Sequence, residues 1–219
     1  MNTPMNTPPT HMDADPRQLT LMDLLDAREN RVYHQKELLN AYPGAVMISM
    51  TLNIPGPVKD NPRYRKALET GLHRLKTILA DRCGSECSFT ILHEEFRPLA
   101  TGPEAYLVAQ SSAANSAASN TAESKKLALE ALALETLALD IKKAAVSVEE
   151  GSALGRLFDM DVLIPGENFP HSISRSQLGA APRRCLLCEE DAKACARSRA
   201  HTMDQLLEKI NEILSDAGL

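Results

Sequence analysis

Hydrophobic positions recur at helical spacing in several stretches of the chain. Residues 18–40 carry apolar side chains at roughly helical intervals with charged residues between them, and residues 61–84 form a second amphipathic pattern. For the second helix we expect Asn61 as the N-cap, Pro62 as the first residue and Gly84 as the stop. A final helix is expected at 202–216.

A fourth helix is indicated by a longer stripe, in which the apolar positions follow one another at intervals of four and three residues. These positions are Leu127, Ala131, Leu134, Ala138, Ile141, Ala145 and Val148. The segment AAVSVEE, taken by itself, also fits a strand. The unbroken stripe favours a helix to about Glu150, ended by Gly151.

Four stretches have strand character instead. Residues 45–57 are rich in β-branched residues and Met and end in Pro-Gly-Pro, whereas 86–96 alternates and 104–110 follows a Gly-Pro pair. These last two should pair through the intervening turn RPLATGP. The fourth strand lies within GRLFDMDVLIPG, residues 155–166.

The order of these elements predicts the fold class. The inner strands and helices follow the order βαββαβ, which is that of a ferredoxin-like split βαβ unit. We therefore expect an α+β fold in which helices back a mostly antiparallel sheet, with a ferredoxin-like or nucleotidyltransferase-like core and extra N- and C-terminal helices. Residues 1–18 read as a flexible tail and 19–219 as a single domain, with a low-complexity linker or insertion at 111–126.

Composition narrows the function classes. The chain has 219 residues and a net charge of −5, which argues against a nucleic-acid-binding protein. No run of 18 apolar residues suggests a membrane span, and the N-terminus lacks the pattern of a signal peptide, so we expect a cytoplasmic protein. The five cysteines, an odd number, argue against a disulfide framework.

Two aspartates interrupt the apolar run of the fourth strand. Because side chains alternate along a strand, Asp159 and Asp161 should share one face, about 7 Å apart, while Phe158, Met160 and Val162 enter the core. Two such carboxylates can hold Mg²⁺, which prefers one or two carboxylates together with substrate phosphates and water. They could equally lie on a solvated face as paired surface charges. The small residues of GSALGR before the strand would leave room for a phosphate group.

A Cys/His/Arg-rich segment at 182–201 offers a second set of candidate ligands. Cys185, Cys188, Cys195 and His201 could close a tetrahedral zinc site, or the thiols could simply be reduced and packed in a turn. Candidate phosphate ligands also gather near these two motifs. They are Arg156, Arg183 and Arg184, together with Lys59 beside a Pro/Gly turn at the end of the first strand.

Taken together, these motifs resemble the apo-citrate lyase phosphoribosyl-dephospho-CoA transferase family, also called holo-citrate lyase synthase. The resemblance covers roughly residues 20–215 and is carried by PGPVKD, TGPEAYL, LGRLFDMDVL and PRRCLLC followed by CARSRAHT. The aspartate pair is also similar in its chemistry to the Gly…Asp-x-Asp motif of polymerase-β-like nucleotidyltransferases.

This resemblance implies a transfer reaction. A serine of the citrate lyase acyl-carrier subunit would attack the triphosphate of 2′-(5″-triphosphoribosyl)-3′-dephospho-CoA and release pyrophosphate, leaving the prosthetic group attached. Asp159 and Asp161 would then hold Mg²⁺ and the cations would bind the substrate phosphates. Two alternatives stay open: an equivalent transferase for another carrier, such as that of malonate decarboxylase, and a zinc-stabilised interaction protein without enzymatic activity.

Overall fold

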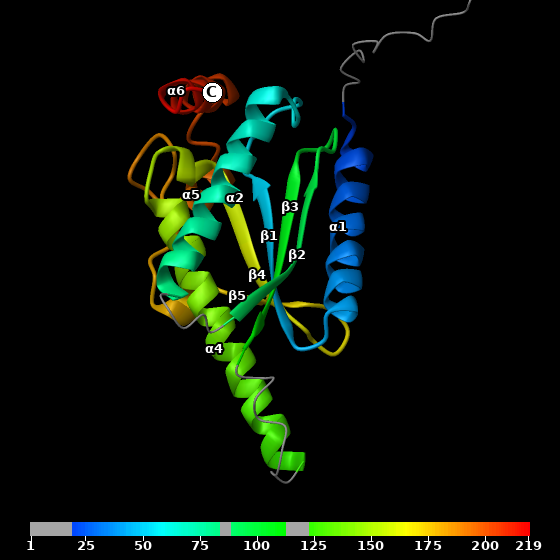
Figure 1. Cartoon of the computed structure of the whole chain (residues 1–219). Helices are drawn as coiled ribbons and strands as arrows, with labels where there is room; N and C mark the ends of the chain where they lie inside the picture. The colour runs from blue at the N-terminus through cyan, green and yellow to red at the C-terminus, as the bar shows by residue number, and fades with distance from the viewer. Residues whose placement is uncertain (1–18, 84–88, 113–122) are drawn as a thin grey trace, which may run out of the picture.

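An antiparallel sheet lies between two layers of helices (Figure 1). The structure is a computed structural model that describes residues 19–83, 89–112 and 123–219. Within these residues the sheet has five strands in the order β2-β3-β1-β4-β5, each antiparallel to its neighbours. The strands are β1 (Ala45–Leu52), β2 (Phe89–Arg97), β3 (Glu104–Ser111), β4 (Phe158–Ile164) and β5 (His171–Ile173).

The first four strands have the connectivity of a split βαβ unit. Helix α2 (Pro62–Cys83) connects β1 to β2, and α4 (Glu123–Glu150) connects β3 to β4. Since β3 lies between β1 and β2, and β1 lies between β3 and β4, both helical connections cross over one strand. The expected α+β fold with a ferredoxin-like core is confirmed, and β5 extends it at the β4 edge.

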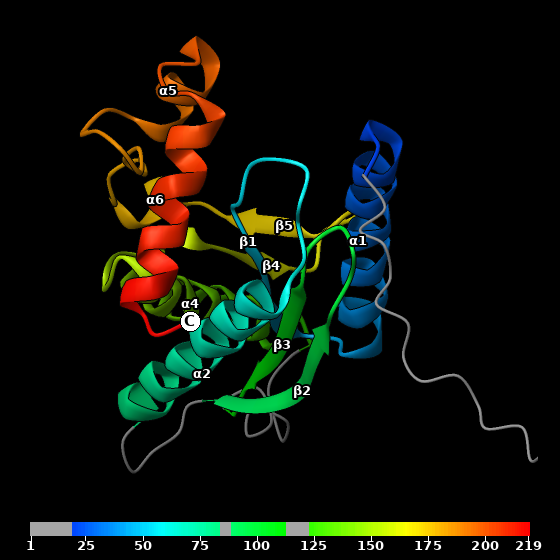
Figure 2. The same ribbon diagram turned by 90° about the horizontal axis from the view of Figure 1, so that it is seen from above.

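One face of the sheet carries the main hydrophobic core. Helices α2 and α4 and the C-terminal helix α6 (Met203–Asp216) lie on this side in Figure 2 and bury apolar side chains of all three central strands, such as Ile48, Leu107 and Phe158. A Cβ atom at Gly71 of α2 would come within 2.7 Å of the Phe158 ring. This glycine therefore allows α2 to approach β4 closely.

Among the described residues, one helix, α1 (Leu21–Ala41), covers the other face. Its N-cap, Thr20, forms a capping box with Asp23. Near its C-terminus α1 buries Leu38 and Leu39 in a small cluster that includes Leu163 of β4. The face of the sheet that carries Asp159 and Asp161 is thus covered over only part of its width.

The helices predicted from the periodicity are present, with shifted ends. Asn61 accepts a hydrogen bond from the Tyr64 amide at the start of α2, as an N-cap should. The long helix begins at Glu123 rather than Leu127 and ends at Glu150, so the helical interpretation of AAVSVEE is confirmed. The sequence did not predict β5, the 3₁₀ helix η2 (Arg175–Leu178) or helix α5 (Ala192–Ser198).

Some expectations lie outside the described residues, namely the 1–18 tail, the Gly84 stop and most of the 111–126 linker. In the part of the chain that is described, none of the helices is long and apolar enough to cross a membrane.

Candidate active site on the exposed face of β4

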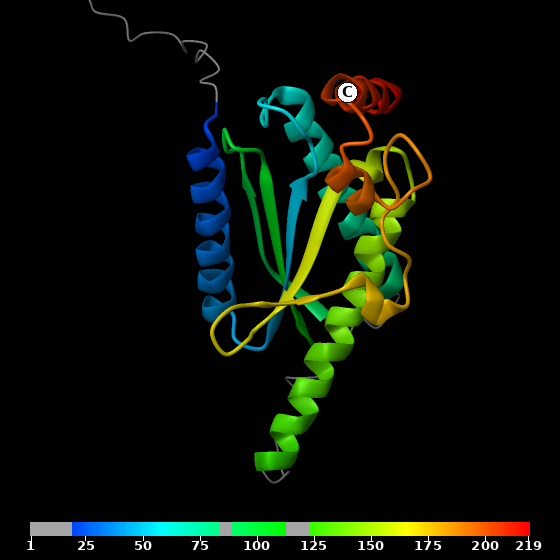
Figure 3. The ribbon, with the colours of Figure 1, turned by 180° about the vertical axis from the view of Figure 1, so that it is seen from behind.

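The side chains of β4 alternate as the sequence predicts. Phe158, Met160 and Val162 are buried in the main core, while Asp159 and Asp161 are exposed on the opposite face. Leu163 lies on the same face as the aspartates, yet it is buried in the cluster beneath α1. The aspartate pair is therefore exposed because α1 does not cover that part of β4; Figure 3 shows the strand from the side opposite to Figure 1.

Polar side chains continue from the aspartate pair across the sheet. Asp161 pairs with Ser49 and Asp159 with Thr51 on β1, and Ser49 in turn pairs with Tyr106 on β3. Under α1, the Gln35 amide donates a hydrogen bond to Ser49 Oγ at 3.0 Å. These polar side chains on β3, β1 and β4 form a polar layer on this face of the sheet. The layer is buried beneath α1 and exposed to solvent at β4.

Glu104 is a buried carboxylate in this polar layer, only 1% exposed. Arg31 Nε of α1 donates to it at 2.7 Å, the Tyr106 hydroxyl donates to it at 2.5 Å, and Arg97 Nη1 lies 3.9 Å away. Burial and the neighbouring Glu104 raise the pKa of Tyr106. Sequence reasoning gave Glu104 no role, although an acid between a Gly-Pro pair and a buried strand in TGPEAYL was a usable signal.

The free edge of β4 is held by two side chains of α4. Strand β5 pairs with β4 only from Val162 onward, so none of the strands that the structure describes pairs with Met160 on that side. Its amide donates to Glu149 Oε1 at 2.9 Å and its carbonyl accepts from Lys142 Nζ at 2.8 Å. These bonds replace the missing strand and satisfy backbone groups that would be costly to leave unpaired.

Glu149 also accepts hydrogen bonds from two arginines at this edge. Arg175 Nη2 donates to Glu149 Oε2 at 2.7 Å, and Arg183 donates to Oε1. The Arg183 guanidinium lies 3.4 Å from Asp159 Oδ1. Glu149 therefore fixes the edge of β4 and directs Arg183 toward Asp159.

The negative charge of the aspartate pair is not fully offset by the neighbouring cations. Desolvation and the nearby Asp159 charge raise the pKa of Asp161, and the cations Lys142 and Arg183 offset this only in part. Burial lowers the pKa of Lys142. A further positive charge beside the pair would relieve the repulsion between the two carboxylates.

The other predicted cations lie farther from the pair. Arg156 donates to the carbonyl oxygens of Arg184 and Cys185, which ties the start of β4 to the cysteine segment. Arg184 is 70% exposed and pairs with Glu189. Among the described residues, Arg183 is the only predicted phosphate ligand that forms an ion pair with an aspartate of the pair.

Lys59 lines a cavity of ≈ 1310 Å³ between α1, the loop after β1 and the β2–β3 turn. Its ammonium group donates to the Ile54 carbonyl, and burial lowers its pKa. Glu104, which also lines this cavity, precedes Ala105, and Ala105, Met50 and Met160 lie in register across β3, β1 and β4. The cavity therefore begins about two strand spacings, roughly 10 Å, from Asp159.

The small residues before β4 do not leave the room expected for a phosphate. A Cβ at Gly155 would lie 2.2 Å from the Val148 carbonyl oxygen, and the Gly155 amide already donates to Ser152 Oγ at 3.1 Å. The expectation was wrong because this glycine serves close packing of the 3₁₀ helix η1 (Leu154–Leu157) against the end of α4.

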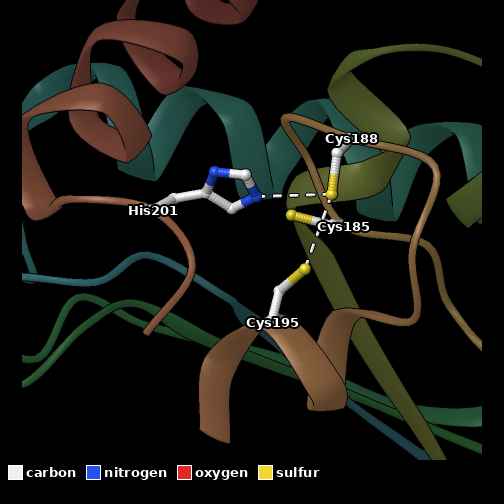
Figure 4. A group of neighbouring side chains, drawn as sticks. All are labelled: Cys185, Cys188, Cys195 and His201. Atoms are coloured by element: carbon white, nitrogen blue, oxygen red, sulfur yellow. Dashed lines mark hydrogen bonds between the residues drawn. The ribbon is translucent and has the colours of Figure 1, made fainter. Parts of the chain in front are cut away.

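The four predicted zinc ligands come together in space, as Figure 4 shows. One ligand atom from each of Cys185, Cys188, Cys195 and His201 lies within 4.8 Å of all the others. We refer to these four residues as the Cys/His cluster. It lies beside the aspartate site, because Arg183 and Arg184 immediately precede Cys185.

The family model described as apo-citrate lyase phosphoribosyl-dephospho-CoA transferase matches residues 19–128 and 114–217. The chain belongs to this family. A probable transferase of this name from Streptococcus pyogenes serotype M5 (strain Manfredo) is 34% identical over 196 residues, covering 90% of this chain and 85% of the relative. A second, from Vibrio cholerae serotype O1 (strain M66-2), is 33% identical over 199 residues, covering 90% and 93%.

Membership of the apo-citrate lyase phosphoribosyl-dephospho-CoA transferase family confirms the resemblance seen in the sequence motifs. The family is one of transferases, so the chain is an enzyme, and the alternative of a non-enzymatic interaction protein is not supported.

Proposed function

We propose that the chain attaches the 2′-(5″-phosphoribosyl)-3′-dephospho-CoA group to citrate lyase at the exposed aspartate face of β4. The serine oxygen of the acyl-carrier subunit forms a bond to the phosphorus next to the ribose. The bond from this phosphorus to the bridging oxygen breaks, and pyrophosphate leaves with the electron pair. The serine proton passes to solvent or to a nearby base, and we place the reaction in the cytoplasm, where CoA derivatives are used.

The observation that supports this placement is the uncovered pair Asp159 and Asp161. Both carboxylates lie on one face, and the donor set fits Mg²⁺, which takes one or two carboxylates with substrate phosphates and water. The raised pKa of Asp161 is also consistent with a site in which Lys142 and Arg183 do not fully offset the two carboxylates. A bound divalent cation would supply neutralisation of the charge that develops on the triphosphate oxygens.

The protein's own cations can bind the phosphates. Arg183 is held against Asp159 by Glu149, so its guanidinium can reach a phosphate placed at the aspartates. Arg184 is exposed with a single surface partner and can bind a phosphate at the rim. Arg156 donates from Nη2 to two carbonyl oxygens, so its Nε and Nη1 could donate to a substrate phosphate.

Lys59 and the cavity it lines would hold the dephospho-CoA part of the substrate. The cavity's volume of ≈ 1310 Å³ exceeds that of a pocket for a drug-sized ligand, about 300–1,000 Å³, as a larger nucleotide ligand requires. Its position near the Asp159 end of the sheet would let one substrate span both places.

A transfer assay with two conservative variants tests the proposal. Apo-carrier is incubated with triphosphoribosyl-dephospho-CoA, Mg²⁺ and enzyme, and the gain in carrier mass is followed by mass spectrometry. Asp159→Asn and Asp161→Asn should each lower kcat/KM by about 100-fold or more, because each removes a carboxylate ligand of the reacting centre.

The matched control is Asp140→Asn. This aspartate on α4 is 57% exposed and pairs only with Lys143 on its own helix, so activity should be unchanged. Near-normal transfer by both active-face variants would contradict the proposed site. Absence of any mass gain with the unaltered protein would contradict the proposed reaction itself.

A further inference from the structure

The segment that carries the Cys/His cluster has almost no hydrophobic core of its own. Among residues 182–201 only Cys185 and Cys195 are buried, at 5% and 8% exposure. A segment of this length needs a cross-link or a metal to hold one conformation when it cannot bury enough apolar surface. Its two buried residues are themselves candidate ligands.

The spacing of the cluster matches tetrahedral coordination. With zinc–sulfur bonds of about 2.3 Å, tetrahedral geometry places two sulfurs about 3.8 Å apart, and a sulfur and a nitrogen slightly closer. Cys188 Sγ and Cys195 Sγ are 3.5 Å apart, and His201 Nε2 lies 3.3 Å from Cys188 Sγ. A disulfide requires sulfurs about 2.05 Å apart, so these two thiols are not bonded.

The local backbone is arranged to present these ligands. Around the Arg184–Asp191 bridge, the Cys185 amide donates to the Glu190 carbonyl at 2.7 Å and closes the turn that contains Cys188. Asp191 then caps α5, which carries Cys195. The helix ends at Ser198, its C-cap Arg199 is a non-glycine residue with φ of 51°, and the chain turns back to His201.

We propose that Cys185, Cys188, Cys195 and His201 bind one zinc(II) ion in a closed structural site. Four protein ligands fill a tetrahedral shell and leave no position for substrate, which is the arrangement of structural zinc rather than catalytic zinc. Three thiolates and one imidazole also favour zinc over the hard cation Mg²⁺.

The zinc site would fix one wall of the aspartate site. Arg183 stands two residues before Cys185, and Arg156 donates to the Cys185 carbonyl, so the cluster holds both arginines in place. His201 is followed directly by Thr202, the N-cap of α6, which links the cluster to the C-terminal helix. This consequence for the arginines rests on the proposed function, but the binding of zinc does not.

Metal analysis of the purified full chain tests the site. We expect about one zinc ion per chain by plasma mass spectrometry, falling below about 0.2 in Cys188→Ser and Cys195→Ser. His201→Cys should retain zinc with four thiolates, whereas His201→Ala should weaken its binding. Cys83→Ser, which removes a cysteine outside the cluster, should keep a full equivalent.

Cobalt substitution provides a readout that does not depend on how well a variant folds or on activity. Replacing zinc by Co²⁺ in the unaltered chain should give the visible absorption of tetrahedral cobalt and a thiolate-to-metal charge-transfer band. Less than about 0.2 equivalents of zinc after purification with added zinc, together with no tetrahedral cobalt spectrum, would overturn the proposal. Equal zinc in the unaltered chain and in Cys188→Ser would overturn it as well.

Discussion

At Asp161, the charge that the proposed function requires lowers the stability of the fold. The pKa of this carboxyl is raised by desolvation and by the charge of Asp159. The folded protein therefore binds this proton more tightly than the unfolded chain does, and the ionised carboxylate destabilises the fold. Such an unfavourable charge is typical of a site that binds a charged ligand.

Asp161→Asn should therefore raise the melting temperature at pH 7 while it lowers the rate of transfer. The raised pKa means that the destabilising charge is present above the folded pKa and disappears as the pH falls toward the ordinary value of 3.8. The difference in melting temperature between the variant and the unaltered chain should shrink as the pH falls below the raised folded pKa and should vanish only below the ordinary value of 3.8.

Calorimetry without divalent cations, at pH values between 4 and 7, would measure this difference. Asp140→Asn serves again as the control, since it changes an exposed helix charge and should shift the melting temperature little. A variant less stable than the unaltered chain at pH 7 would contradict the assigned electrostatics.

At the scale of elements, periodicity predicted the long helices and the four long strands but not the short elements between them. β5 has three residues and α5 has seven, so neither is long enough to show a pattern. β5 exists because it pairs with β4, and α5 because Asp191 caps it beside the cluster. These causes lie in the tertiary structure and leave no periodic signal.

Some candidate site residues could likewise be identified from local sequence patterns, whereas the role of others depends on the tertiary structure. The alternation of β4 and the cysteine spacing are local patterns, so Asp159, Asp161 and the Cys/His cluster were identifiable from the sequence. Glu149 and Lys142 stand seven residues apart on α4, and their role depends on the missing strand partner of Met160. Only the three-dimensional arrangement of α4 and β4 shows it.

Glu149 makes the edge of β4 sensitive to a single substitution. Glu149→Ala should lower the free energy of unfolding by about 3–5 kcal/mol, because it leaves a buried amide and two arginines without their acceptor. Glu149→Gln keeps an oxygen for the Met160 amide and should cost less, about 1–3 kcal/mol.

Urea unfolding would measure both variants of Glu149. The adjacent Glu150→Gln is the matched control, because Glu150 is 59% exposed and pairs only with Arg175, so its loss should cost no more than about 1 kcal/mol. Equal costs for Glu149→Ala and Glu150→Gln would show that the edge is held by other contacts.

At the scale of the whole molecule, the unequal covering of the sheet creates the site. In the described part of the chain, helices α2, α4 and α6 cover one face and form the core, whereas α1 is the one helix over the other face (Figure 2). The uncovered strip of β4 and the cavity beside α1 are two results of the same arrangement. A substrate with a triphosphate at one end and a long CoA-derived group at the other suits two adjacent places of this kind.

Lys59 lies in the cavity and away from the aspartates. A substitution at Lys59 therefore tests substrate binding separately from the chemical step. If the CoA-derived part occupies the cavity, Lys59→Gln should raise KM for triphosphoribosyl-dephospho-CoA by about tenfold, the effect of losing one charge-assisted hydrogen bond, with little change in kcat. The variant should also be less sensitive to salt, because one cation fewer attracts the phosphates.

Lys66→Gln provides the comparison for Lys59→Gln, since Lys66 is 64% exposed on α2 and pairs with Glu69. Steady-state transfer assays at several substrate concentrations would separate KM from kcat. An unchanged KM in Lys59→Gln would exclude a phosphate contact at this lysine. A loss confined to kcat would instead place Lys59 at the reacting phosphorus, which would require the substrate to bind in the opposite orientation along the face of the sheet.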